Sequence, residues 1–86
     1  MNINELIKIV KSKIEAEIVI QGIQIEDKSF LHKNHKNHEE GKFHLKLTIK
    51  SDELIKQSRI ESTKNIYNIL DLELKKHIHS IQILLS

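Results

Sequence analysis

The chain has 86 residues, and its 14 basic and 12 acidic side chains leave a formal charge of only +2. A chain of this length builds one small domain, and without cysteine it forms neither a disulfide nor a thiolate-ligated metal site of its own. The balanced charge gives little indication of nucleic-acid binding, and no apolar run approaches the roughly 20 residues that cross a membrane. We therefore expect a cytoplasmic protein whose six histidines are the main candidates for chemistry.

The N-terminal part of the chain predicts a helix followed by a strand. A helix is expected over about residues 4–16, with Asn4 as its N-cap and with apolar side chains at helical spacing at Leu6, Val10 and Ile14. From residue 17 the period changes to alternation, and Gly22 interrupts it. We therefore predict the first strand at about residues 23–27.

A polar segment and a second strand come next. Residues 28–42 are polar, include Gly41 and predict a long loop that carries His32, His35 and His38. Residues 43–50 then alternate strictly between apolar and polar side chains, which predicts a strand buried on one face. His44 falls on the polar face of this strand and is expected to be a surface group or a group that supports a neighbouring site.

The C-terminal third predicts two more helical segments and a strand. Ser51 is expected to cap a short helical turn, and a long helix is expected over residues 59–76. The apolar stripe assigned to that helix as core consists of Ile60, Thr63, Tyr67, Leu70 and Leu74, and Ile66 and Ile69 widen it. Alternation at Ile81, Ile83 and Leu85 predicts the last strand, with His79 at its start.

This order of elements predicts where the histidines meet. A strand, helix, strand connection within one sheet is normally parallel and right-handed. The second and third strands then begin at the same edge of the sheet. The loop at residues 28–42 delivers the chain to the start of the second strand, and His79 stands at the start of the third. We therefore expect the loop histidines and His79 to converge.

Several short motifs resemble those of the BolA family over nearly the whole chain. The segment 27–32 (Asp-Lys-Ser-Phe-Leu-His) resembles the family's Asp-x-Ser-x-x-His element, and His35 completes a His-x-x-His form. Residues 44–47 resemble the His-Phe-x-Val strand, and residues 51–54 resemble Ser-Asp-x-Phe. The family's last motifs lie at the end of the long helix and at the start of the last strand. They are resembled by residues 66–70, by Glu73-Leu74 and by residues 78–81 (Ile-His-Ser-Ile).

The resemblance implies an αββααβ fold: one α+β domain over residues 1–86, similar to class II KH domains, with a three-stranded mixed sheet and helices on one face. It also implies a heterodimer with a monothiol glutaredoxin that shares one [2Fe-2S] cluster. The glutaredoxin and its glutathione supply thiolates, and this chain supplies His79 and either His32 or His35. The isolated chain is then expected to be a monomer that binds no cofactor. Its role is that of an accessory protein in iron–sulfur cluster assembly, cluster trafficking or iron regulation.

Two other functions remain open from the sequence. A KH-like regulator would bind nucleic acid and contact it, or a partner, through Arg59, Lys64 and His44. Against this, Lys56 replaces the family's glycine, and residues 62–64 (Ser-Thr-Lys) replace its Arg-His-Arg segment. The third hypothesis is a divalent-metal site built from His32, His35 and His38. His77 is expected only to stabilise the end of the long helix. No motif of a catalytic triad or phosphate-binding loop is present, so we expect no enzyme.

Overall fold

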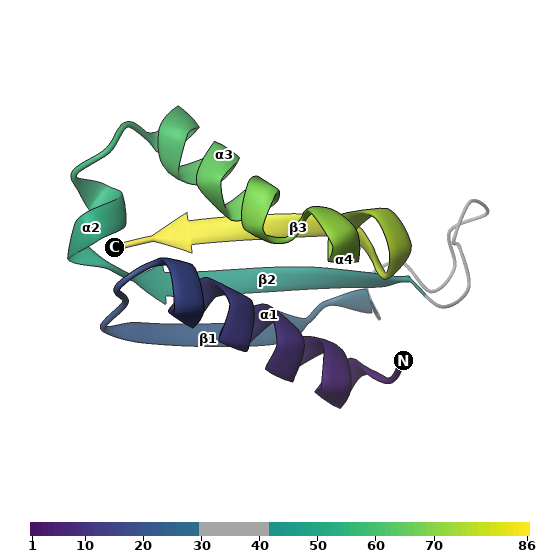
Figure 1. The fold of residues 1–86 in the computed structure, drawn as a ribbon. Helices are drawn as coiled ribbons and strands as arrows, with labels where there is room; N and C mark the ends of the chain where they lie inside the picture. Colours follow the sequence, from purple (N-terminus) through teal and green to yellow (C-terminus); the bar gives the residue numbers. More distant parts are fainter. Residues whose placement is uncertain (30–41) are drawn as a thin grey trace.

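The computed structural model describes residues 1–29 and 42–86. Its elements are α1 (Ile3–Glu17), β1 (Gly22–Asp27), β2 (Phe43–Lys50), α2 (Asp52–Ile55), α3 (Arg59–Ile69), α4 (Asp71–Lys76) and β3 (Ile78–Leu85). The strands form one sheet in the order β1-β2-β3, in which β2 pairs antiparallel with β1 and parallel with β3. Helices α1, α3 and α4 lie on one face of this sheet, and α2 lies at one end (Figure 1). The predicted α+β architecture and the parallel pairing are therefore confirmed.

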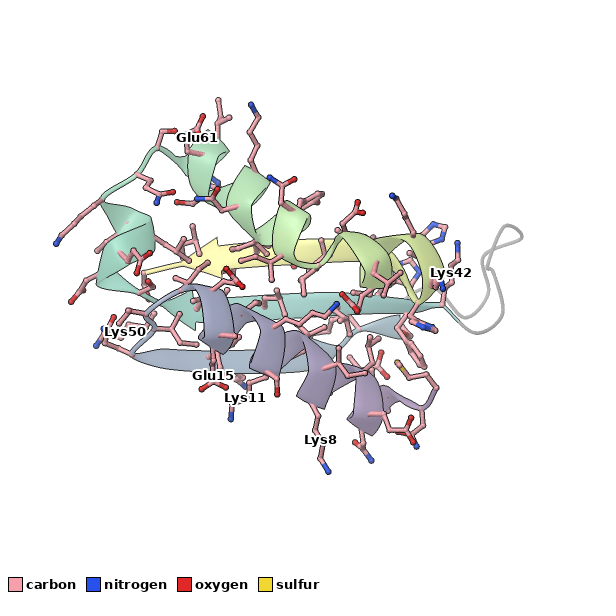
Figure 2. The ribbon with its side chains drawn as sticks, in the orientation of Figure 1. Lys8, Lys11, Glu15, Lys42, Lys50 and Glu61 are labelled. Carbon is pink, nitrogen blue, oxygen red and sulfur yellow. The ribbon has the colours of Figure 1, made fainter. Side chains whose placement is uncertain are left out.

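The core lies between the central strand and the helices. Strand β2 contributes its inward residues, and α1 and α3 contribute one stripe each; the buried set includes Leu6, Val10, Ile14, Leu45, Leu47, Ile49, Ile66 and Leu70. The exposed side of α1 is charged, and Figure 2 shows Lys8, Lys11 and Glu15 projecting from α1 on the side of β1, away from α3 and α4. Burial of this apolar set is the main stabilising contribution to the fold.

Helix α1 begins earlier than the sequence pattern predicts. Its N-cap is Asn2, whose Oδ1 atom accepts a hydrogen bond of 2.9 Å from the backbone N–H of Glu5. The prediction of Asn4 as the cap is wrong, because Asn4 lies inside the first turn. Both asparagines suit an N-cap, and Asn2 has the extended backbone that a cap requires (φ −88°, ψ 168°).

The predicted long helix over residues 59–76 is divided in two. The backbone leaves helical geometry at Leu70 (φ −98°, ψ 16°), which separates α3 from α4. The assigned core stripe is also wrong at two positions, since Ile60 is 71% exposed and Tyr67 is 42% exposed. Ser62 takes an inward position instead, because its Oγ atom donates a buried hydrogen bond of 2.6 Å to the Leu54 carbonyl oxygen. Ser62 lies on the same side of α3 as the buried Ile66, so a polar residue faces α2.

Strand β3 begins at Ile78, earlier than its alternating pattern indicates. Phe43 is paired with Ile78, and its N–H donates to the His77 carbonyl oxygen at 2.9 Å. The next pair is His44 with Ser80, so β3 has one residue more than β2 at this point. The extra residue is His79. This β-bulge places His79 outside the regular ladder.

Ser51 joins three segments of the fold and should be costly to replace. Its buried Oγ atom donates to the Val19 carbonyl oxygen (2.8 Å) and accepts from the Leu54 N–H (3.2 Å). We expect Ser51→Ala to lower the free energy of unfolding by about 2 kcal/mol, because it removes a cap, leaves the buried Leu54 N–H unpaired and removes the part-buried bond to the Val19 carbonyl oxygen.

The matched control for this prediction is Ser58→Ala. Ser58 is exposed and only caps α3, by accepting a hydrogen bond from the Glu61 N–H. Its replacement should cost about 1 kcal/mol. Urea unfolding of both variants, followed by circular dichroism, measures the difference, and equal losses would contradict the linking role of Ser51.

Candidate functional site

Two histidines meet at the edge of the sheet where β2 and β3 begin. The ring centroids of His44 and His79 are 4.8 Å apart, and the two planes are tilted by 45°. His44 comes from the regular part of β2, and His79 is the bulged residue of β3. Residues 35 positions apart in the sequence are thus brought into contact by the parallel pairing.

His44 is a buried, well-fixed side chain. Only 7% of it is exposed, so the prediction that it lies on a solvated face is wrong. Its Nδ1 atom lies 2.6 Å from the Oγ atom of Ser80, which occupies the paired position on β3. Its backbone N–H donates to Ser29 Oγ at 3.0 Å, and its carbonyl oxygen accepts from the Lys28 N–H at 2.7 Å. Side chain and backbone of His44 are therefore both held in place.

His79 differs from His44 in being open to solvent. Its side chain is exposed, and its ring forms no hydrogen bond with any residue in the described part of the chain. The bulge explains this orientation, because an extra residue in a strand turns its side chain away from the ladder. His79 is therefore available as a ligand, and it is backed by the fixed ring of His44.

The chain enters and leaves the histidine-bearing segment beside this pair. Ser29 bonds the His44 backbone, and its own N–H donates to Asp27 Oδ1 at 2.9 Å. Lys42 directly precedes β2 at the same end of the sheet (Figure 2). His32, His35 and His38, the candidate loop ligands, lie outside the described residues.

The other predicted contact residues lie elsewhere. Arg59 and Lys64 are exposed on α3, and Arg59 borders a groove at the C-terminal end of β3, opposite to the His44–His79 pair. The structure therefore does not bring Arg59 and Lys64 together with His44. His77 is the C-cap residue of α4, at the helix end where it was expected.

Sequence reasoning missed the serines that surround His44. Ser29 and Ser80 lie within the motif segments, but their partners depend on the register of two strand pairings. Within residues 1–29 and 42–86, no three His, Asp or Glu side chains gather closely enough to hold a metal ion. No helix in those same ranges has the length and apolar character needed to span a membrane.

Comparisons with known proteins identify solved structures with the same fold. The structure is similar to the BolA domain of SufE1 from Arabidopsis thaliana, with a TM-score of 0.78, 26% identity, and coverage of 100% of this chain and 93% of that one. It also has the fold of BolA1 from Arabidopsis thaliana (TM-score 0.75, 22% identity, 90% and 85% coverage). The same holds for BolA1 from Mus musculus (TM-score 0.71, 16% identity, 90% and 60% coverage).

Sequence comparison gives a family but no individual relative. No curated protein matches the chain. The family model described as BolA-like protein matches residues 14–86, which include both histidines of the pair and every strand. With that match over most of its length and the same fold in the solved structures, the chain belongs to the BolA family.

Proposed function

We propose that this chain acts with a monothiol glutaredoxin and shares a [2Fe-2S] cluster with it, as a non-enzymatic accessory protein of iron–sulfur cluster assembly, cluster trafficking or iron regulation in the cytoplasm. The observation that carries the proposal is the exposed ring of His79. It stands at the sheet edge beside Ser29, where the chain enters the histidine-bearing segment.

The histidines of this chain are suitable ligands for part of a [2Fe-2S] cluster. Imidazole can hold one iron of a [2Fe-2S] centre, as it does in Rieske proteins. His79 is one ligand, and His32 or His35 is the other. His32 follows Ser29 by three residues, and an extended chain of three residues can span about 10 Å. This length is enough for the side chain of His32 to reach His79. The thiolates come from the glutaredoxin and its glutathione, because this chain has no cysteine.

His44 has a supporting role in this proposal. Nδ1 of His44 is engaged with Ser80, and the ring packs against that of His79. Groups behind a metal ligand fix its orientation and tune its basicity. His44 therefore limits the positions that the His79 ring can take, while His79 makes the bond to iron.

The nucleic-acid alternative has less support from the described residues. Arg59 and Lys64 are exposed on α3, but Glu61 lies between them and α2 carries Asp52 and Glu53 close by in the chain. Phosphate binding needs a concentration of positive charge that this mixed surface lacks.

Anaerobic cluster reconstitution tests the proposal. The chain is mixed with a monothiol glutaredoxin, glutathione, iron and sulfide, and the visible circular dichroism is compared with that of glutaredoxin alone. We expect a distinct spectrum and a heterodimer by size-exclusion chromatography, because histidine replaces thiolate at one iron. Identical spectra and no co-elution would overturn the proposal.

A further inference from the structure

Strand β3 has a free edge with regularly spaced hydrogen-bonding groups. Strand β3 is an edge strand, because it pairs with β2 on one side and with no described strand on the other. The N–H of Ser86 donates to the Ile49 carbonyl oxygen, and the Ser86 carbonyl oxygen accepts from the Ser51 N–H. Even-numbered residues after the bulge therefore bond to β2. Since main-chain groups alternate sides along a strand, those of Ile81, Ile83 and Leu85 point to the free edge.

Beyond the bulge at its start, strand β3 carries none of the features that normally protect an edge strand from pairing. From Ile78 to Leu85 there is no charged residue, no proline and no glycine. The opposite edge strand, β1, ends with Glu26 and Asp27. Edge strands usually carry charges, prolines or bulges that prevent pairing, and β3 has its single bulge only at its start, at His79.

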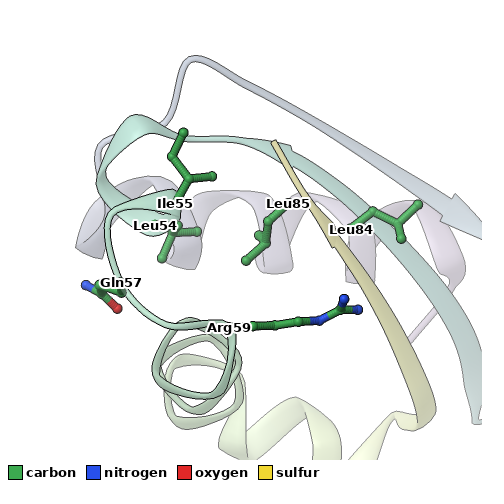
Figure 3. A pocket seen from close by; sticks show the side chains of 6 residues that line it. All are labelled: Leu54, Ile55, Gln57, Arg59, Leu84 and Leu85. Carbon is green, nitrogen blue, oxygen red and sulfur yellow. The ribbon is translucent and has the colours of Figure 1, made fainter.

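A groove lies along this edge near the C-terminal end of β3 (Figure 3). It has a volume of about 300 Å³ and is lined by Leu54, Ile55, Gln57, Arg59, Leu84 and Leu85. Leu85 pairs with Ile49, so it lies on the helix-covered face, whereas Leu84 pairs with Thr48 on the open face. A groove that touches both residues reaches both faces of the sheet at the C-terminal end of β3.

The walls of the groove are apolar apart from Gln57 and Arg59. Ile55 is 53% exposed, and Leu84 is also exposed. The guanidinium of Arg59 reaches from the start of α3 toward β3 (Figure 3) and forms no ion pair with any described residue. Ile60, the next residue of α3, is also exposed.

The geometry points to a docking site for an extended segment of a partner protein, which adds to β3 as a fourth strand. The segment runs antiparallel to β3, the more stable pairing, and exchanges hydrogen bonds with Ile81, Ile83 and Leu85. Its apolar side chains contact Ile55 and Leu84, and an acidic side chain near its N-terminus meets Arg59.

A peptide fits this surface better than a nucleic acid does. The edge presents alternating N–H and C=O groups at the repeat of a β-strand, and a peptide backbone offers the matching groups. A polyanion would meet a single arginine here, with Glu61 only two residues further along α3. The groove lies about 16 Å along β3 from His79, so both surfaces can be used at once.

Amide hydrogen exchange measured by NMR on the whole chain tests the proposal. The probe is a short blocked peptide that starts with glutamate and continues with alternating valine and threonine. In the free protein we expect fast exchange at Ile81 and Ile83, because their N–H groups face solvent, and slow exchange at Gln82 and Leu84. Saturating peptide should slow exchange at Ile81 and Ile83 by about tenfold or more, and leave Gln82 unchanged.

Three controls make the result decisive. The same peptide with its strand-facing amides methylated should give no protection, since it cannot form the ladder. Arg59→Glu should weaken binding of the glutamate peptide about tenfold, whereas Lys64→Glu, on the same helix, should not. Unchanged exchange at Ile81 and Ile83 with saturating peptide would overturn the proposal. Stronger perturbation of the groove by a single-stranded oligothymidylate than by the peptide would also overturn it and assign the surface to nucleic acid.

Discussion

His79→Ala should abolish the mixed cluster with glutaredoxin while leaving the fold intact. The side chain of His79 is exposed and bonds to no described residue, so its removal costs little packing. Changes in groups that merely support a ligand lower metal affinity about 10–100-fold, so loss of a direct ligand should lower it by about 100-fold or more. Titration of the chain into cluster-loaded glutaredoxin, followed by visible circular dichroism, measures the effect.

His77→Ala is the matched control for this prediction. His77 is the same residue type only two positions away, but it contributes its backbone to the fold: its N–H donates to Glu73, and its carbonyl oxygen accepts from Phe43. Alanine retains both bonds. His77→Ala should therefore bind the cluster like the unchanged chain, and equal behaviour of the two variants would contradict a specific role for His79.

The second large effect concerns the ion pair between α1 and α4. Lys13 Nζ lies 2.7 Å from Glu73 Oε2, and Glu73 is only 4% exposed. Lys13→Met removes the cation and leaves a buried carboxylate without its partner. Breaking a buried pair in this way costs about 3–5 kcal/mol, and because Lys13 is partly exposed we expect about 2–3 kcal/mol.

Replacing both partners should recover most of that loss. The second carboxylate oxygen of Glu73, Oε1, is buried and has no hydrogen-bond partner among the described residues, so the pair is incompletely compensated. Lys13→Met with Glu73→Met removes the buried charge and its desolvation cost together. Urea unfolding of the two single variants and the double variant measures the coupling. A double variant less stable than Lys13→Met alone would contradict this account.

The sequence predicted the fold well because its strongest patterns are local. Alternation in residues 43–50 identified the central strand with its observed bounds, and Ser51 was correctly assigned as the cap of α2. The wrong predictions arose where the local sequence fits two structures equally well. Asn2 and Asn4 are both good caps, and Ser62 looks solvent-exposed until the Leu54 carbonyl oxygen provides its buried partner.

The candidate site was predictable in part. The parallel pairing of the last two strands, inferred from the connection between them, placed His79 at the correct edge. The burial of His44 could not be inferred from alternation, because the face opposite the helices is normally wet. The contacts of His44 with Ser80, Ser29 and the ring of His79 depend on the bulge and on both strand registers.

The most direct measurement of the central claim is pulsed electron paramagnetic resonance of the reduced mixed cluster. This chain is labelled with a nitrogen isotope in its histidine rings only, and the glutaredoxin is left unlabelled. We predict strong couplings to two labelled imidazole nitrogens. His77→Ala should leave both couplings unchanged, whereas His79→Ala should leave no mixed cluster to give them. A reduced cluster that shows no coupling to labelled nitrogen would mean that its ligands are all thiolates, and would contradict the account.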